Sequence, residues 1–174
     1  MRSWASAGDF ILEAFGVQPF ASSKPDGDIT EPVDYVDPMD GANMTGHLAL
    51  PADSWQKPSP AVVIFPDWDG VNEYERERAT ILAEMGYVAF AADIYGSDLQ
   101  FVEDFGERAE LVGTYFGNPE LFMSRMQTAI DQVKARDDVD SDEIAIIGYC
   151  FGGKFNRSTG ITIVSPFIIL SFCH

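Results

Sequence analysis

Three short runs of apolar and largely β-branched residues constrain the fold of this chain more than any other feature. They occupy residues 61–65, 87–92 and 144–147. Uninterrupted apolar runs of this length are typical of strands that are buried on both faces. Segments with helical periodicity separate the runs, and this alternation predicts an α/β sandwich. We expect a mostly parallel sheet with helices on both of its faces.

The first intervening helix carries clear start and stop signals. Asn72 can cap its N-terminus, Glu75 stands at the capping-box position, and Gly86 can end it. A set of apolar or long side chains at helical spacing is expected to form its inward face: Tyr74, Arg78, Ile81, Leu82 and Met85.

Two further helical stripes precede the third apolar run. The first stripe comprises Val102, Phe105, Ala109, Val112 and Phe116. The second helix should begin at Asn118, a capping residue that is followed by proline in the first turn. Its expected inward residues are Phe122, Met126, Ile130 and Val133. Both helices are predicted to pack on the sheet through these stripes.

The chain is expected to contain one domain with an extension before it. Residues 1–28 end in a turn-rich segment and are interpreted as an N-terminal extension. Residues 29–153 form the predicted α/β domain, an incomplete version of the sandwich. This domain opens with two short strands, 33–36 and 44–50, joined by a turn at Asp40–Gly41.

Residues 154–174 do not continue the pattern and are interpreted as an aberrant C-terminal tail. Gly160 and the β-branched residues after it oppose a helix, and Pro166 obstructs a central strand. The Gly-Lys-Phe sequence at 153–155 can be encoded by an unremoved splice-donor site. We therefore hypothesise that the tail is translated intron sequence. Comparison of transcript and genomic DNA across the codon of Gly153 tests the hypothesis, and an uninterrupted exon there would contradict it.

Charge and cysteine content exclude several classes of function. The chain has 11 basic and 28 acidic residues, a formal net charge of −17. Such a surface repels phosphate backbones and anionic lipids, so nucleic-acid and membrane partners are not expected. Two cysteines are too few for a disulfide framework or a thiolate metal cage, and a cytosolic location is the default expectation. The apolar stretch 161–172 is shorter than the roughly 20 residues of a membrane span.

The most informative motif follows the third apolar run directly. Residues 148–153 read Gly-Tyr-Cys-Phe-Gly-Gly, a nucleophile elbow with Cys150 at its centre. A nucleophile at the tip of a tight strand-to-helix turn takes strained backbone angles. The residues two before and two after it must lack Cβ, which explains Gly148 and Gly152. A helix N-terminus beneath the thiol would also lower its pKa.

Two other interpretations fit the residues of this segment less well. A cysteine that is not in a disulfide is often an inert, buried small hydrophobe, but the position after a buried strand favours the elbow. Residues 148–154 also match the start of a phosphate-binding loop. That loop requires Ser or Thr at the next position to bind Mg²⁺, and Phe155 stands there instead, so nucleotide binding is disfavoured.

Two further segments resemble a known family. Residues 65–72 read Phe-Pro-Asp-Trp-Asp-Gly-Val-Asn, and residues 86–96 read Gly-Tyr-Val-Ala-Phe-Ala-Ala-Asp-Ile-Tyr-Gly. With the elbow, they are similar to the dienelactone hydrolases, a branch of the α/β-hydrolases, over roughly residues 32–153. The resemblance implies a hydrolase of small ester or lactone substrates that uses no metal and no organic cofactor.

The resemblance also implies roles for individual residues. Cys150 would be the nucleophile, and the backbone N–H groups of Phe151 and Trp68 would form the oxyanion hole. Asp67 stands where the family usually carries a glutamate that contacts the resting cysteine. Ser97–Asp98 replaces an arginine that grips a substrate carboxylate in the original dienelactone hydrolases. An anionic dienelactone is therefore not the expected substrate.

The catalytic acid and histidine of the family have no counterpart in the expected order. In α/β-hydrolases both follow the nucleophile along the chain. The residues after Cys150 contain no Asp or Glu, and their histidine is the terminal His174. His47 precedes the first apolar run and is interpreted as an exposed strand or turn histidine. The activity of the 174-residue chain is therefore expected to be impaired.

Three functions remain open from the sequence. The first is ester or lactone hydrolysis through an acyl-enzyme on Cys150. The second is a non-catalytic fragment that retains the elbow without a base. The third is a binding or redox role for an exposed thiol of low pKa. The sequence gives no indication of the oligomeric state.

Overall fold

The structure of the protein is a computed structural model, and it describes residues 29–52, 54, 58–99, 101–153 and 168–172. Along the described chain the elements are β1 (Ile29–Val36), β2 (Asn43–Leu50), β3 (Ser59–Phe65), α2 (Glu73–Glu84), β4 (Val88–Ala91), η1 (Ser97–Leu99), α3 (Phe105–Gly117), α4 (Pro119–Lys134), β5 (Val139–Tyr149), α5 (Cys150–Gly153) and β6 (Ile168–Phe172).

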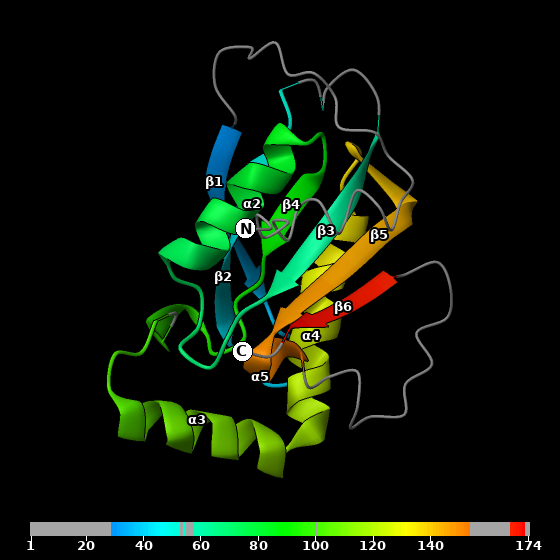
Figure 1. The fold of residues 1–174 in the computed structure, drawn as a ribbon. Coiled ribbons are helices and arrows are strands. Elements are labelled where there is room, and N and C mark those ends of the chain that lie inside the picture. Colours follow the sequence, from blue (N-terminus) through cyan, green and yellow to red (C-terminus); the bar gives the residue numbers. More distant parts are fainter. Residues whose placement is uncertain (1–28, 53, 55–57, 100, 154–167, 173–174) are drawn as a thin grey trace, which may run out of the picture.

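The strands form one mixed sheet in the order β1-β2-β4-β3-β5-β6 (Figure 1). Strands β4, β3, β5 and β6 are parallel, whereas β1 and β2 pair antiparallel with each other and β2 pairs antiparallel with β4. The three apolar runs are the adjacent parallel strands β4, β3 and β5, as predicted. The predicted hairpin at the start of the domain is also confirmed, and its first strand begins earlier, at Ile29.

Helices cover both faces of the sheet, which confirms the predicted fold class. In Figure 1, α2 lies in front of the sheet and α4 lies behind it. Alternate residues of β3 point into the two layers: Val62 and Ile64 join the core on the α2 side, while Ala61, Val63 and Phe65 join the core on the α4 side. All of them are at most 1% exposed. This burial is why the run is continuously apolar.

The predicted helix boundaries hold where capping residues were identified. Asn72 caps α2 and forms a reciprocal capping box with Glu75. After α2, Gly86 adopts φ +96°, a conformation that glycine adopts without steric cost. The Asn118 side chain accepts from the N–H of Leu121 at 3.1 Å at the start of α4, whose predicted inward residues are all buried.

The predicted inward face of α2 is wrong in part. Tyr74 and Ile81 are 37% and 39% exposed. The buried residues of the helix are Glu75, Ala79, Leu82 and Ala83. The two alanines present little bulk toward the sheet, whereas the larger apolar side chains at Tyr74 and Ile81 are left partly in solvent. Periodicity that does not weigh side-chain size therefore identified Leu82 correctly but missed the two alanines.

The predicted stripe of α3 is wrong in part as a packing surface: Val112 is partly buried and packs against the core, whereas the aromatic residues at both ends of the stripe are exposed. Phe105 is 69% exposed and Phe116 is 47% exposed, and Tyr115 is the buried residue of this helix. Val102 is buried, but it lies in the loop before the helix. Helical periodicity identifies an apolar stripe, but it does not show whether another element covers it.

The tail falls mostly outside the described residues, as does the N-terminal extension. Residues 168–172 form β6, which pairs parallel to β5 from Ala145 to Tyr149. The residue pattern of the tail does not predict this strand. The strand begins at Ile168, and Pro166 lies outside the described residues. Within the described ranges, no helix is long and apolar enough to cross a membrane.

A buried ion-pair cluster that the sequence analysis did not predict attaches α4 to the turn between β1 and β2. Arg125 lies 3.0 Å from the buried Asp37 and forms a two-pronged contact with Asp40 at 3.0 and 2.8 Å. The hydroxyl of Ser124 donates to Asp37 at 2.7 Å. These partners are some 85 residues apart in sequence, so only the folded chain reveals them.

Candidate active site at the nucleophile elbow

Cys150 lies at the junction between β5 and α5 with φ +39°. Among the residues that the structure describes, Cys150 is the only one other than glycine with a positive φ. Side chains rarely adopt this conformation, and such strain persists only where the surroundings enforce it. The thiol-bearing residue is partly exposed, whereas the residues on either side of it are buried. The geometry at Cys150 is that predicted for a nucleophile elbow.

Two glycines allow the elbow to close. A Cβ on Gly148 would lie 2.5 Å from the carbonyl oxygen of Gly152. A Cβ on Gly152 would lie 2.7 Å from the carbonyl oxygens of both Phe65 and Pro66. These neighbours are backbone atoms that cannot rotate away. The spacing of the glycines around Cys150 is therefore a steric requirement of this turn.

The elbow is attached to the loop that follows β3. The N–H of Gly152 donates to the carbonyl oxygen of Pro66 at 3.1 Å, and Gly148 pairs in register with Phe65. The loop turns at once, since the N–H of Gly70 donates to the carbonyl oxygen of Asp67 at 3.2 Å. Two segments far apart in the sequence thus meet at the carboxyl ends of adjacent parallel strands, where open α/β sheets bind ligands.

The loop and the elbow bring the predicted site residues together at the carboxyl ends of β3 and β5. Trp68 is partly buried, and its N–H donates to the Asp67 carboxylate. Phe151 is 2% exposed and packs among aromatic rings, including Tyr95 at 5.9 Å between centroids. The Trp68 N–H that the sequence analysis assigned to an oxyanion hole is therefore bonded to Asp67 in this structure.

Carboxyl groups dominate the electrostatics beside the loop. Burial, and next the negative charge of Asp67, raise the pKa of Asp69. Burial is also the main reason that the pKa of Glu75 is raised, since this side chain is 1% exposed. Its Oε2 accepts from the N–H of Asn72 at 3.1 Å, while Oε1 has no hydrogen-bond partner within the described structure. Arg108 lies 3.9 Å from Asp69 and partly offsets this charge.

His47 does not reach the elbow. It lies on β2, which is separated from β5 by β4 and β3. Neighbouring strands are spaced by about 4.8 Å, so three steps place His47 about 14 Å from the strand that ends at Cys150. It is partly buried, and burial lowers the pKa of its imidazole. The other histidine, His174, lies outside the described residues.

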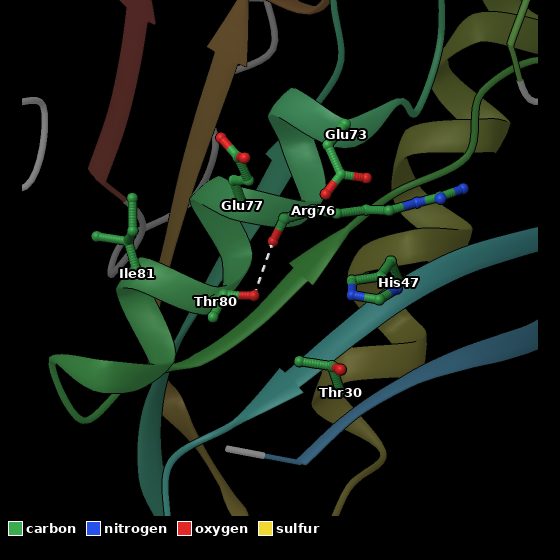
Figure 2. A pocket seen from close by; sticks show the side chains of 7 residues that line it. All are labelled: Thr30, His47, Glu73, Arg76, Glu77, Thr80 and Ile81. Atoms are coloured by element: carbon green, nitrogen blue, oxygen red, sulfur yellow. Dashed lines mark hydrogen bonds between the residues drawn. The ribbon is translucent and has the colours of Figure 1, made fainter. Parts of the chain in front are cut away.

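His47 instead lines a shallow hollow of about 480 Å³ between the first strands and α2. Figure 2 shows Thr30 and His47 rising from the strands, opposite a row of α2 side chains: Glu73, Arg76, Glu77, Thr80 and Ile81. None of the predicted site residues lines this hollow, so it is not the candidate active site.

Ser97 and Asp98, which the resemblance places where the original dienelactone hydrolases have an arginine, belong to η1. Ser97 lies 2.8 Å from the hydroxyl of Thr45, and Asp98 is exposed. No cation replaces the arginine within η1. Across the part of the chain that the structure describes, no group of three or more His, Cys, Asp or Glu side chains is arranged to hold a metal ion.

Tyr95 makes a contact in this region that the sequence does not predict. Its hydroxyl donates to the Trp68 carbonyl oxygen at 2.8 Å. Tyr95 belongs to a quoted motif, but the motif alone does not show where its hydroxyl is directed. The available signal was a tyrosine two residues after Asp93 at the end of a buried strand.

Comparisons with known proteins identify the family of the chain. A model described as the dienelactone hydrolase family matches residues 44–160, more than half of the chain. A Bradyrhizobium protein named "Probable 2-oxo-3-(5-oxofuran-2-ylidene)propanoate lactonase" is 25% identical over 124 residues, which cover 71% of this chain and 49% of the relative. The chain spans about half the length of the curated relatives it matches.

Two solved structures are similar in fold and sequence. The protein m3DLH superposes with a TM-score of 0.68 at 32% identity, covering 74% of this chain and 52% of its own. The dienelactone hydrolase-like promiscuous phosphotriesterase P91, from metagenomic libraries, superposes with a TM-score of 0.70 at 31% identity. The match covers 83% of this chain and 59% of P91. With the elbow, the loop after β3 and the family match in agreement, this chain belongs to the dienelactone hydrolase family.

Proposed function

We propose that the protein hydrolyses small, uncharged esters or lactones with Cys150 as the nucleophile. The Cys150 thiolate attacks the substrate carbonyl carbon, forming a C–S bond while the carbonyl π electrons move to oxygen. Collapse of this intermediate expels the alcohol as its alkoxide and leaves a thioester, which water hydrolyses. The observation that carries the proposal is the strained φ of +39° at Cys150, within a turn closed by glycines.

The N–H groups of Phe151 and Trp68 serve as the oxyanion hole in this proposal. Both residues lie where the elbow meets the loop after β3. Donors already in position stabilise the charge that develops on the substrate oxygen. Because the Trp68 N–H is bonded to Asp67, the Asp67 carboxylate must release it before the substrate oxygen can bind. Asp67 thus acts as a gate on this donor.

The charge around the elbow favours an uncharged substrate. Asp67 and Asp69 lie in the loop beside it, and the whole chain has a net charge of −17. The position that would supply an anion-gripping arginine holds Ser97–Asp98. A carboxylate-bearing substrate would approach against this potential. Neutral aryl and alkyl esters and simple lactones are therefore the proposed substrates.

Deacylation is the slow step proposed for the 174-residue chain. His47 lies three strands from β5, and the chain contains only one other histidine, His174. General-base assistance to water contributes roughly 10²–10⁴-fold. Attack on an activated ester depends less on this base, because a thiolate is itself nucleophilic. The chain should therefore acylate readily and turn over slowly.

Rapid mixing with p-nitrophenyl acetate tests this proposal. We expect a burst of p-nitrophenolate close to one per chain, followed by a steady rate roughly 10²–10⁴-fold below that of full-length relatives. Cys150→Ser should abolish the burst, since a hydroxyl without a base is a poor nucleophile. Cys173→Ser is the matched control, because it removes the other cysteine of the chain and should leave the burst unchanged.

The alternatives give different results in the same assay. A burst that survives Cys150→Ser excludes Cys150 as the nucleophile. Sustained turnover by the wild-type chain contradicts the proposed slow deacylation and makes His174 the next residue to substitute. A chain with no burst, but with Cys150 that is readily oxidised by peroxide, would instead support a thiol-based redox role.

A further inference from the structure

The buried carboxylate of Asp93 fixes the backbone of Tyr95 beside the candidate active site. Tyr95 follows β4, and its side chain is 6% exposed. Asp93 Oδ1 accepts from the N–H groups of Tyr95 and Gly96 at 2.9 and 3.0 Å, while Oδ2 accepts from the N–H of Thr45 at 3.0 Å. Gly96 adopts φ +110°, which lets the chain turn sharply after the tyrosine. The Asp93 carboxylate therefore fixes the backbone of Tyr95 and joins this turn to β2.

The side chain of Tyr95 contacts both residues of the proposed oxyanion hole. Its hydroxyl donates to the carbonyl oxygen of Trp68 at 2.8 Å. Its ring stacks on the ring of Phe151, with centroids 5.9 Å apart and planes inclined by 21°. Trp68 lies in a loop outside helices and strands, so it depends on such contacts to keep its orientation.

We propose that Tyr95 is a positioning residue that aligns the Trp68 and Phe151 N–H groups for catalysis, an assignment that rests on the proposed hydrolase function. An oxyanion hole is effective only when its donors are oriented before charge develops. The Tyr95 hydroxyl fixes the carbonyl side of Trp68, and its ring supports Phe151. Burial raises the pKa of the Tyr95 hydroxyl, so it remains a protonated donor across the working pH range.

Two reactions of the same thiol separate positioning from general stability. Acylation by p-nitrophenyl acetate places negative charge on the carbonyl oxygen before nitrophenolate leaves. Alkylation by iodoacetamide displaces iodide from carbon and develops no oxyanion. A residue that aligns the oxyanion donors should therefore affect only the first reaction. A residue that merely supports the fold should affect both reactions or neither.

The test compares Tyr95→Phe with Tyr35→Phe in the full 174-residue chain. Tyr35 is also 6% exposed, and its hydroxyl donates to the carbonyl oxygen of Asp93 at 2.9 Å, so the control loses the same kind of bond. Removing one oxyanion donor outright costs about 10²–10³-fold. We expect Tyr95→Phe to slow acylation by about 10-fold and to leave alkylation unchanged, and Tyr35→Phe to change neither rate.

Each other outcome has a defined meaning. Equal slowing of acylation and alkylation, or unchanged acylation, overturns the assignment of Tyr95. Loss of the folded circular dichroism signal in Tyr95→Phe, with Tyr35→Phe still folded, assigns Tyr95 to stability and also overturns it. Absence of acylation at Cys150 in the wild-type chain rejects the proposed function itself, which is a separate result.

Discussion

The elbow and α3 differ sharply in what holds them in place. At the elbow, Gly148 and Gly152 bring backbone against backbone, with no room for a single added carbon. In α3, by contrast, a Cβ on Gly113 or on Gly117 would meet nothing within 4 Å. Phe105 at the start of α3 is 69% exposed. Close backbone contacts hold the elbow in place, whereas a few side chains hold α3 in place.

This difference indicates where the sequence is constrained by the fold. At the elbow, Gly148 and Gly152 are required because an added Cβ would lie less than 3 Å from backbone atoms. In α3 the attachments include the hydroxyl of Tyr115, which donates to the Ile94 carbonyl at 2.7 Å, and the edge contact of Phe105 with Trp68. Substitutions at the elbow should therefore be severe, and those on the outer face of α3 should be mild.

The largest effect is expected for Gly152→Ala. The new Cβ would lie 2.7 Å from two backbone carbonyl oxygens, and relief would move β3 away from the elbow. We expect a loss of at least about 3 kcal/mol in the free energy of unfolding, together with loss of the acylation burst. Urea denaturation followed by circular dichroism measures the first effect. A variant of wild-type stability would show that the elbow is not closely packed.

A smaller, pH-dependent effect is expected for Glu75→Gln. Glu75 is a buried residue in the first turn of α2, the helix that follows the loop after β3. The folded state raises the pKa of Glu75, mainly through burial, so the fold favours the protonated form. Its stabilising contribution is complete below the ordinary pKa of 4.5 and is lost as the pH rises through the raised value. Glutamine stays neutral and can still accept from the Asn72 N–H.

Thermal unfolding of the Glu75→Gln variant and wild type at several pH values tests this sign. The midpoint of the variant should exceed that of wild type at about pH 8, and the difference should shrink toward about pH 4. A difference that does not depend on pH would mean that Glu75 is not titrating with folding. A variant that is less stable at the higher pH would show that the fold tolerates the buried charge.

The smallest effect is expected for Gly113→Ala on α3, the matched control for Gly152→Ala. Nothing lies within 4 Å of the added Cβ, and alanine is a better helix former than glycine. We expect a gain of about 0.5–1 kcal/mol in the free energy of unfolding, with the acylation burst unchanged. Destabilisation by this substitution would show that α3 is packed more tightly than its exposure indicates.

Much of the sheet and the elbow could be predicted because local sequence determines them. The strands β3, β4 and β5 are recognisable from apolar runs, since burial on both faces removes the need for polar residues. The elbow is recognisable because its turn excludes Cβ at Gly148 and Gly152. The caps of α2 and α4 follow from single polar side chains at known offsets.

The remaining features depend on contacts that no local pattern contains. The inward face of α2 is set by the small size of Ala79 and Ala83, which periodicity does not weigh. The exposure of Phe105 depends on the absence of a covering element among the described residues. The bond from Tyr95 to Trp68 joins residues 27 apart in sequence. Such contacts appear only once the elements are arranged.

The most direct test of the central claim is to locate the acyl group. The chain would be mixed with p-nitrophenyl acetate, quenched in acid during the burst, and digested for mass spectrometry of its peptides. We predict one acetyl group per chain, on the peptide that contains Cys150, with Cys173 unmodified. Acetylation confined to Cys173 or to lysine side chains, with Cys150 unmodified, would contradict the account.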